Sequence, residues 1–356
     1  MVSRLFIIFL IVFFPTLKAQ RIVEKQLLDQ MSTAINLSEY SGINSVIIAK
    51  KADVLYERYF NRYTRDSLQD SRSSFKSITS LLIGIAIDKG FIKSVNQKVY
   101  EFFPGNKILK TDVLKSKITI KDLLEMRSGI DCEEFYETKI CEDDMSLSRD
   151  WVEFSLNRRM KTNPGELWSY TSVNPMICSG ILTNATGMSV VEFAKKYLFD
   201  PLGVQNYKWT IDPAGNAMTA GSFYILPKDM LKIGLLVKNN GKWKNRQIVS
   251  EKWIRQSTEC EIVIPEFSFM KSSRSKIGIP QSTYYGFYWY KELLKTNDVA
   301  ENLLFASGNG GQYIFIVKDL DLTVVFTQSN YGSYKAKQAF EIIAKYIIPA
   351  VKAGEL

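Results

Sequence analysis

The chain has 356 residues, of which 46% are apolar and 13% aromatic, and it carries a formal net charge of +9. This composition predicts a globular protein with one large core or two lobes that share a cleft, and the scattered lysines and arginines argue against a nucleic-acid partner. The chain contains no histidine, which excludes a Ser-His-Asp triad, a Cys-His dyad and a His-ligated zinc site.

The N-terminus has a basic residue, Arg4, followed by ten apolar residues at 5–14. A membrane-spanning helix needs about 20 apolar residues, so this run is too short. The pattern predicts a signal peptide over residues 1–19, cut near Ala19, and an exported protein in the periplasm or outside a bacterial cell. Under this prediction the chain meets a membrane only through its signal peptide. An uncleaved inner-membrane anchor is the alternative.

Residues 20–37 have the apolar spacing of a helix, further helices are predicted at 78–91 and 228–239, and helical patterns dominate from 118 to about 211. The strand-like segments lie near the two ends of the chain. They are predicted at 43–49, 54–60, 284–290, 303–307, 312–317 and 322–327, and a final helix is predicted at 335–351.

This arrangement predicts an α/β (α+β) fold, in which an antiparallel sheet is flanked by terminal helices and a mainly helical lobe is inserted. The sheet lobe is expected to comprise about residues 20–75 and 280–356, and the helical lobe about 76–279. The cleft between the two lobes is the expected place for a site.

An S-x-x-K motif at Ser73 and Lys76 stands directly before the apolar helix predicted at 78–91. Residues three apart at a helix start share a face, and the free N–H groups there favour developing negative charge. The helix dipole and burial are expected to lower the pKa of Lys76, so that its amine can take a proton. A capping serine and a surface lysine are the alternative. Two further S-x-x-K motifs, at 268–271 and 273–276, have no predicted helix behind them and are set aside.

Two more segments can contribute to acyl transfer. Tyr170 follows a Pro-Gly turn at 164–165, and a phenol beside a lysine can shuttle a proton to a leaving group. The glycine-rich segment 307–312 allows a ligand close to the backbone, where a main-chain N–H near Gly311 can pair with that of Ser73 as an oxyanion hole. A core tyrosine and a glycine-rich hairpin loop are the alternatives. Because histidine is absent, activity is not expected to fall through pH 6–7.

The four cysteines lack metal-ligand spacing, and we predict neither a metal nor a cofactor. Cys132 and Cys141 can close a short loop in an oxidising compartment, and free thiols are the equally open alternative. Cys178 stands in an apolar run and is expected to be packed in the core.

These segments, in this order, resemble the serine β-lactamase and penicillin-binding superfamily, in the class C-like branch with the 6-aminohexanoate-dimer hydrolases and esterase-like serine hydrolases. The resemblance runs over about residues 45–326 and includes the stretches at 118–129 and 198–203. It implies a β-lactamase/transpeptidase-like fold in which Ser73 is the acylated nucleophile, Lys76 its base and Tyr170 a shared acid/base. It also implies these substrate-binding residues: Ser172, Asn309, Gly310 and Gly311.

Two departures from the family pattern concern specificity. Ser172 stands where the Tyr-x-Asn motif has asparagine, and the strand motif, which usually begins with Lys, His or Trp, offers only Ser307 and Gly308. No cation is therefore expected at this strand to hold the carboxylate of a penicillin or of a D-Ala-D-Ala tail. This favours an ester or amide substrate.

The sequence thus predicts an exported serine hydrolase that forms an acyl-enzyme on Ser73 and acts on a small ester, amide or peptide. The alternatives are a β-lactamase or DD-peptidase, a catalytically weak penicillin-binding-like sensor module, and an exported helical interaction protein. Specificity is expected to lie in the loops at 131–149 and 260–282. The sequence makes no prediction of the oligomeric state.

Overall fold

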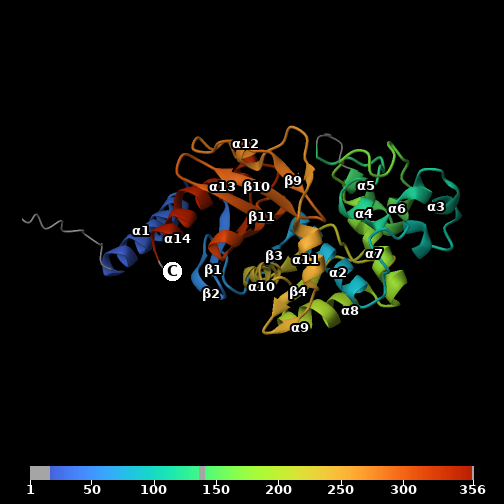
Figure 1. The fold of residues 1–356 in the computed structure, drawn as a ribbon, viewed down its shortest axis with the longest axis horizontal. Coiled ribbons are helices and arrows are strands. Elements are labelled where there is room, and N and C mark those ends of the chain that lie inside the picture. Colours follow the sequence, from blue (N-terminus) through green and yellow to red (C-terminus); the bar gives the residue numbers. More distant parts are fainter. Residues whose placement is uncertain (1–16, 136–140, 355–356) are drawn as a thin grey trace, which may run out of the picture.

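The computed structural model describes residues 17–135 and 141–354 (Figure 1). Its largest feature is an eight-stranded sheet with the strand order β2-β1-β13-β12-β11-β10-β9-β8, in which every pair is antiparallel. The fold is therefore of the predicted α/β class. The strands are β1 (Ile43–Lys50), β2 (Asp53–Tyr59), β8 (Ile262–Val263), β9 (Thr283–Tyr285), β10 (Tyr290–Lys295), β11 (Ala300–Gly308), β12 (Gln312–Val317) and β13 (Leu322–Gln328).

The two ends of the chain meet inside this sheet, because β1 pairs with β2 on one side and with β13 on the other. Val46 lies opposite Arg58 and opposite Phe326. Strands β12 and β13 are buried along their whole length, and every residue of β1 except the last, Lys50, is buried. Strands covered on both faces have near-continuous apolar runs, so the sequence of β12 and β13 lacks the usual alternation.

The prediction of one strand over 284–290 was wrong, since this segment forms β9, a turn and β10. Tyr285 and Tyr290 lie opposite each other in the sheet. Between them Tyr288 has φ of 64°, and the N–H of Gly286 donates to the carbonyl of Trp289 at 2.9 Å. The side chains of the turn are buried as a strand's would be. Composition alone therefore could not separate the turn from a strand.

Helices cover both faces of the sheet. Phe340 in α13 (Ala339–Ile342) packs on Phe315 with ring centroids 5.1 Å apart, and α14 (Ile348–Ala353) packs on α1 (Leu17–Asn36). On the other face, a side chain at Gly234 of α10 (Pro227–Lys238) would lie 2.7 Å from Ile314. Ile314 and Phe315 are neighbours in β12 and therefore point to opposite faces. The terminal helices and α10 thus enclose the sheet between them.

The mainly helical part of the chain lies beside the sheet (Figure 1). Two small sheets belong to it, β3-β5-β4 and β6-β7. Their strands are β3 (Gln69–Asp70), β4 (Tyr207–Trp209), β5 (Phe223–Ile225), β6 (Lys242–Trp243) and β7 (Arg246–Gln247). The helices are α2 (Phe75–Asp88), α3 (Lys107–Thr111), α4 (Ile120–Leu124), α5 (Cys141–Leu147), α6 (Trp151–Asn157), α7 (Val173–Thr186), α8 (Val190–Ala194), α9 (Asp200–Leu202) and α11 (Glu251–Thr258), whereas α12 (Phe269–Ser273) packs against α13 and against β11 of the large sheet.

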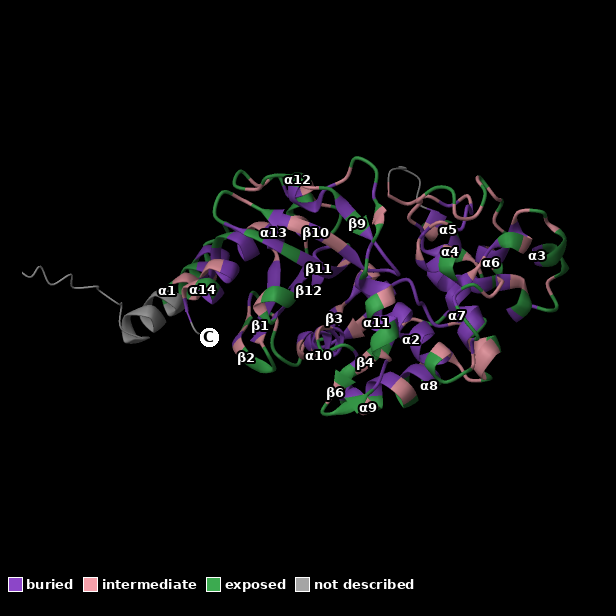
Figure 2. Cartoon of the chain, viewed as in Figure 1, coloured by how far each residue is buried: buried purple, intermediate pink, exposed green. Residues whose placement is uncertain are grey.

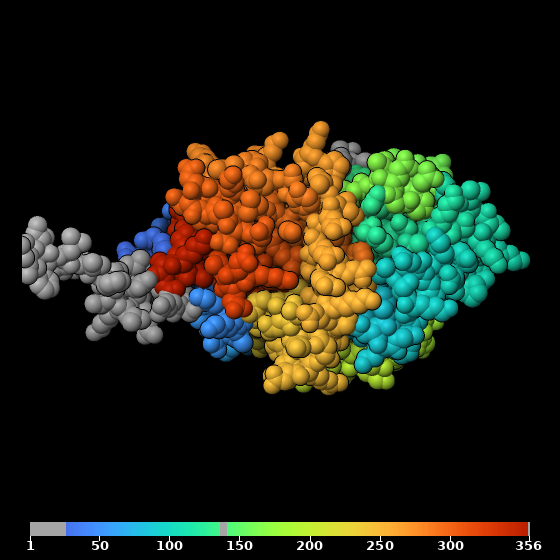
Figure 3. Space-filling view, viewed as in Figure 1, coloured from blue at the N-terminus to red at the C-terminus, as the bar shows by residue number. Residues whose placement is uncertain are grey.

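Helix α2 joins the two parts of the molecule. It contacts α7, α11 and β11, and its residues from Phe75 to Ala86 are all buried (Figure 2). A helix that is buried on every side is typical of a core position. In the space-filling view, the gold segment that includes α11 lies between the orange sheet region and the cyan and green helical region (Figure 3). The residues that precede and begin α2 therefore lie where the sheet and the helical lobe meet.

Cys132 and Cys141 form a disulfide with a Cα–Cα distance of 5.4 Å, whereas Cys178 and Cys260 are free and buried. The predicted signal peptide, residues 1–19, lies outside the described residues except for its last three, with which α1 begins. Within residues 17–135 and 141–354, no helix is both long enough and apolar enough to span a membrane.

Candidate active site

Ser73 lies in a 3-10 turn, Arg72–Ser74, directly before α2. The turn is tight: Arg72 has φ of 48°, and the Ser74 hydroxyl donates to the carbonyl of Ser71 at 2.7 Å. The end of β11 closes on this turn, since a side chain at Gly308 would lie 2.5 Å from the Ser71 carbonyl oxygen. Glycine is therefore required at 308 to bring the strand end beside Ser73.

Lys76 is buried one helical turn after Ser73, with 1% of its surface exposed. Its Nζ donates to Ser73 Oγ at 2.9 Å, to the carbonyl of Ala220 at 2.9 Å and to Ser172 Oγ at 3.3 Å. Three acceptors match the three donors of a lysine ammonium. Lys76 is thus a fully hydrogen-bonded core cation, and the alternative of a surface lysine does not apply.

The expectation that the pKa of Lys76 is lowered was wrong. Burial lowers this pKa. The neighbouring Tyr170 and the carboxylates of two acidic residues raise it, and together they outweigh burial, so that the pKa of Lys76 is raised. The two acidic residues are Glu142 and Glu134. Glu134 stands two residues after Cys132 and Glu142 in the first turn of α5, and nothing in the sequence indicated that either lies near Lys76. At neutral pH Lys76 is therefore an ammonium ion that donates to Ser73.

Tyr170 lies in the segment before α7, and it lines the same cavity as Ser73. Its ring centroid is 4.8 Å from Lys76 Nζ and 5.8 Å from the ring centroid of Phe135. The structure therefore brings together the three predicted catalytic residues, which come from two separate segments of the chain.

Ser172 is completely buried and donates hydrogen bonds to Glu134, a residue that the sequence analysis did not identify. Its main-chain N–H donates to Glu134 Oε1 at 2.8 Å, and its hydroxyl donates to Glu134 Oε2 at 2.9 Å. Burial raises the pKa of Glu134 to about 7, against the lowering effect of Lys76. The position of Glu134 two residues after Cys132 was the only signal that could have identified it.

Only the first part of the glycine-rich segment 307–312 lines the cavity. Ser307, Gly308 and Asn309 line the cavity, whereas side chains at Gly310 and Gly311 would meet Tyr331 and Gln328 instead. The N–H of Gly311 donates to the carbonyl of Gly308 at 3.1 Å. The expectation that this N–H completes an oxyanion hole therefore does not hold.

The cavity that Ser73 lines has a volume of about 400 Å³. Its walls are largely aromatic, and its polar lining includes the hydroxyls of Ser307 and Ser333 and one lysine, Lys337. The aromatic lining residues are Phe135, Tyr170, Phe267, Phe269, Tyr290, Tyr313 and Tyr334.

A sequence model of the beta-lactamase family matches residues 38–346 of this chain. The chain belongs to the beta-lactamase family. It is 24% identical over 229 residues to the 6-aminohexanoate-dimer hydrolase of Paenarthrobacter ureafaciens, an alignment that covers 61% of this chain and 57% of that enzyme. The matched region thus spans little more than half the length of that relative.

Solved structures show the same fold. A family VIII carboxylesterase superposes with a TM-score of 0.67 at 15% identity, over 91% of this chain and 96% of that one. A hydrolase with promiscuous acyltransferase activity superposes with a TM-score of 0.70 at 13% identity, over 93% of this chain and 99% of that one. At these identities the likeness concerns the fold.

The two other S-x-x-K motifs of this beta-lactamase-family protein serve structural roles. Ser268 caps the short helix α12, which the sequence did not predict, and its hydroxyl donates to Glu292 at 2.8 Å. The hydroxyl of Ser273 donates to the carbonyl of Met270 at 2.7 Å. Neither serine lines the Ser73 cavity.

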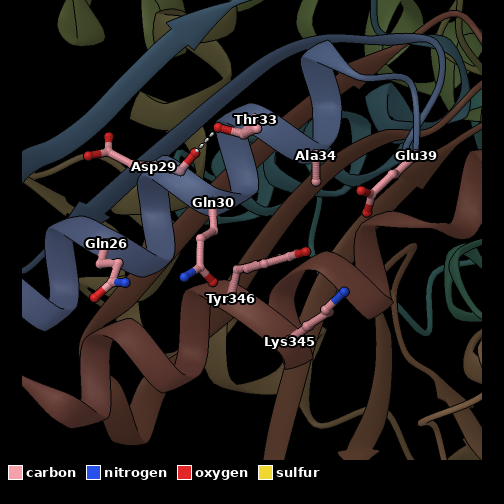
Figure 4. Close-up of a pocket in the computed structure, with 8 residues that line it drawn as sticks. All are labelled: Gln26, Asp29, Gln30, Thr33, Ala34, Glu39, Lys345 and Tyr346. Carbon is pink, nitrogen blue, oxygen red and sulfur yellow. Dashed lines mark hydrogen bonds between the residues drawn. The ribbon is translucent and has the colours of Figure 1, made fainter.

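A larger hollow of about 830 Å³ lies between α1 and the C-terminal helices (Figure 4). The Thr33 hydroxyl there donates to the backbone carbonyl of Asp29 at 2.9 Å, as in an ordinary helix turn. The described residues that line this hollow include no serine. They are Gln26, Asp29, Gln30, Thr33, Ala34, Glu39, Lys345 and Tyr346. In the part of the chain that the structure describes, no cluster of three or more His, Cys, Asp or Glu residues could hold a metal ion. The Ser73 cavity is therefore the candidate site.

Proposed function

We propose that this chain is an exported serine hydrolase that forms an acyl-enzyme on Ser73 and hydrolyses an ester or amide bond. The observation that supports this most strongly is the 2.9 Å hydrogen bond from Lys76 to Ser73 Oγ in an aromatic cavity that Tyr170 also lines. The names of the relatives, a 6-aminohexanoate-dimer hydrolase and a carboxylesterase, agree with amide and ester chemistry.

In the proposed acylation step, Tyr170 rather than Lys76 accepts the proton of Ser73. Lys76 already donates a hydrogen bond to Ser73 Oγ, and its raised pKa keeps it protonated. In this proposal Tyr170 acts from its phenolate form, beside the Lys76 cation, whose Nζ lies 4.8 Å from the ring centroid. The phenolate takes the hydroxyl proton as Ser73 Oγ bonds to the substrate carbonyl carbon, and the phenol then gives that proton to the leaving group.

The tetrahedral intermediate needs two donors for its oxyanion. We assign them to the main-chain N–H groups of Ser73 and Asn309. Asn309 lines the cavity and follows Gly308, the residue that brings the strand end close to the serine turn. In deacylation, water attacks the acyl-enzyme and Tyr170 accepts its proton, so that Ser73 leaves with a proton restored.

Glu134 acts in this proposal through Ser172 as a positioning residue. Its carboxylate receives two hydrogen bonds from Ser172, whose hydroxyl in turn accepts one from Lys76. The carboxylate therefore compensates the positive charge of Lys76 through Ser172, and Lys76 keeps its hydrogen bond to Ser73.

The test is hydrolysis of p-nitrophenyl acyl esters, amino-acid anilides and nitrocefin by the purified protein. Ser73→Ala should abolish turnover of every substrate that is cleaved, and Tyr170→Phe should lower kcat by about 10²- to 10⁴-fold. Ser273→Ala is the matched control, because Ser273 begins another S-x-x-K motif outside the cavity. Full activity in Ser73→Ala, or its loss in Ser273→Ala, would contradict the assignment. Cleavage of nitrocefin alone would favour a β-lactamase.

Export is tested separately by N-terminal mass spectrometry of the protein from a bacterial periplasm. The expected mature chain starts at or near Gln20, after the predicted signal peptide. Recovery of membrane-bound protein that retains residues 5–14 would support the uncleaved anchor instead.

A further inference from the structure

Lys337 brings a cation into the Ser73 cavity from a segment far along the chain. It is the last residue of the 3-10 turn Tyr334–Lys337, and it lines the cavity together with Ser73. We propose that Lys337 binds a carboxylate carried by the substrate, so that the enzyme prefers anionic esters or amides over neutral ones. This inference rests on the proposed function and names the substrate class of the same site.

The charge of the cavity lining supports an anionic ligand. Among the described lining residues, Lys337 is the only lysine or arginine, and none is an aspartate or glutamate. The remaining walls are aromatic rings, hydroxyls, Asn309, two glycines and an alanine. A cation among apolar walls attracts a carboxylate more strongly than it would in water, because the surroundings screen the charge less.

Lys337 itself has no partner within the residues that the structure describes. No hydrogen bond or ion pair joins it to another side chain, whereas its neighbour Lys335 donates to Ser41 Oγ at 3.2 Å. Burial lowers the pKa of Lys337, and no neighbouring anion opposes the effect. A partly buried cation without a partner costs free energy, and a bound carboxylate would offset this cost.

The turn that holds Lys337 is fixed on both sides. Ser333 Oγ accepts a hydrogen bond from the N–H of Lys335 at 3.2 Å, and the Ala336 carbonyl accepts one from Gln328 at 3.2 Å. Next in the chain, the Gln338 amide donates to the carbonyl of Ser41 at 2.6 Å. The backbone at Lys337 is thus anchored to β13 and to the segment before β1, as a rigid binding site requires.

This cation was absent from the sequence prediction. The strand motif carries no Lys, His or Trp, from which we expected no cation for a carboxylate. Lys337 comes from the turn after β13 instead, and only the tertiary fold brings it to the cavity.

The experiment compares kcat/KM for matched esters in wild type, Lys337→Met, Lys337→Arg and Lys335→Met. One pair carries the charge on the acyl side, mono-p-nitrophenyl glutarate against p-nitrophenyl valerate. The other carries it on the leaving group, 4-acetoxybenzoate against its methyl ester. The readout is the ratio of kcat/KM for the anionic ester to that for the neutral ester.

We expect at least one pair to show a preference for the anionic ester that Lys337→Met lowers by about 10- to 100-fold. Lys337→Arg should retain part of the preference, Lys335→Met all of it, and added salt should weaken it in wild type. A ratio that is unchanged in Lys337→Met for both pairs would overturn the inference while the proposed function stands. If wild type cleaves none of the four esters and no other substrate, the proposed function itself fails.

Discussion

The hydroxyl of Ser172 connects Lys76 to Glu134: it accepts a hydrogen bond from Lys76 Nζ at 3.3 Å and donates one to Glu134 Oε2 at 2.9 Å. Since the hydroxyl proton points to the carboxylate, its lone pair faces the lysine, and Lys76 must be the donor. This contact agrees with the raised pKa of Lys76, which keeps the lysine an ammonium at neutral pH. In the proposed acylation step, the Ser73 hydroxyl is then free to give its proton to Tyr170.

Ser172→Ala should therefore lower kcat/KM by about 10- to 100-fold. The variant leaves Lys76 with one acceptor fewer and removes one of the two hydrogen bonds that Ser172 donates to a partly buried carboxylate, which costs roughly 1–3 kcal/mol. Kinetics on the best ester substrate measures the effect, with a thermal melt to check folding. Ser169→Ala is the nearby control and should keep full activity. A wild-type rate in Ser172→Ala would remove the Ser172 contact from the account.

Glu134 should give the enzyme a pH dependence near neutrality. Its pKa is raised to about 7, so its carboxylate takes up a proton as the pH falls through this value, and the charge that balances Lys76 is lost. We expect kcat/KM to fall on the acid side of about pH 7. The charged groups that face Glu134 are Lys76 and Glu142. From the absence of histidine we expected no fall in activity between pH 6 and 7. In the folded chain, the Glu134 carboxylate titrates in this range instead.

Glu134→Gln distinguishes this origin of the limb from others, because the amide does not titrate. The variant should show a flatter kcat/KM profile between pH 5 and 8, at a lower maximum. Glu133→Gln is the control, since that residue neighbours Glu134 in the chain and its carboxylate accepts a hydrogen bond from the N–H of Phe135. An acid limb that stays in place in Glu134→Gln would assign the titration to another group.

The same pKa shift predicts a pH effect on stability. Because the folded-state pKa of Glu134 lies above its ordinary value of 4.5, the free energy of unfolding should fall as the pH rises from about 4.5 to about 7. The loss should reach at most ~3 kcal/mol, and Glu134→Gln should lack this part of the slope. Urea unfolding at pH 4.5 and pH 8 measures it for both proteins. If the free energy of unfolding changes equally with pH in the two proteins, the ionisation of Glu134 does not destabilise the folded state.

The parts of the site that lie close together in the sequence could be predicted. The spacing of Ser73 and Lys76 at the start of an apolar helix places both side chains on one face, and this local geometry depends on few other residues. The pKa of Lys76 could not be predicted, because it depends on Tyr170, Glu142 and Glu134, which come from distant parts of the chain. Lys337 was missed for the same reason.

The fold shows the same division. The apolar runs at β12 and β13 indicated strands, because burial on both faces selects for apolar side chains along the whole strand. The turn between β9 and β10 was missed because its residues are aromatic and buried. Its reversal depends on the positive φ of Tyr288, a conformation that the residue type does not indicate.

The disulfide between Cys132 and Cys141 should support activity, because Glu134 lies inside the loop that it closes. Cys132→Ser with Cys141→Ser should lower kcat/KM and destabilise the protein by roughly 2–3 kcal/mol, the loop-closure contribution of a short loop. Adding reductant to wild type should have the same effect and none on the double variant. If activity is equal in all three states, the disulfide does not hold Glu134 in place.

The central claim, that Ser73 carries the acyl group, is tested most directly by trapping the covalent intermediate. The protein is incubated with a fluorophosphonate or a slowly hydrolysed ester, digested and mapped by mass spectrometry. We predict one adduct, on the peptide that contains Ser73, with labelling lost in Ser73→Ala and slowed in Lys76→Ala. The losses of turnover in these two variants should not add, because both residues serve one step. An adduct on another residue, or turnover that persists in Ser73→Ala without any adduct, would contradict the account.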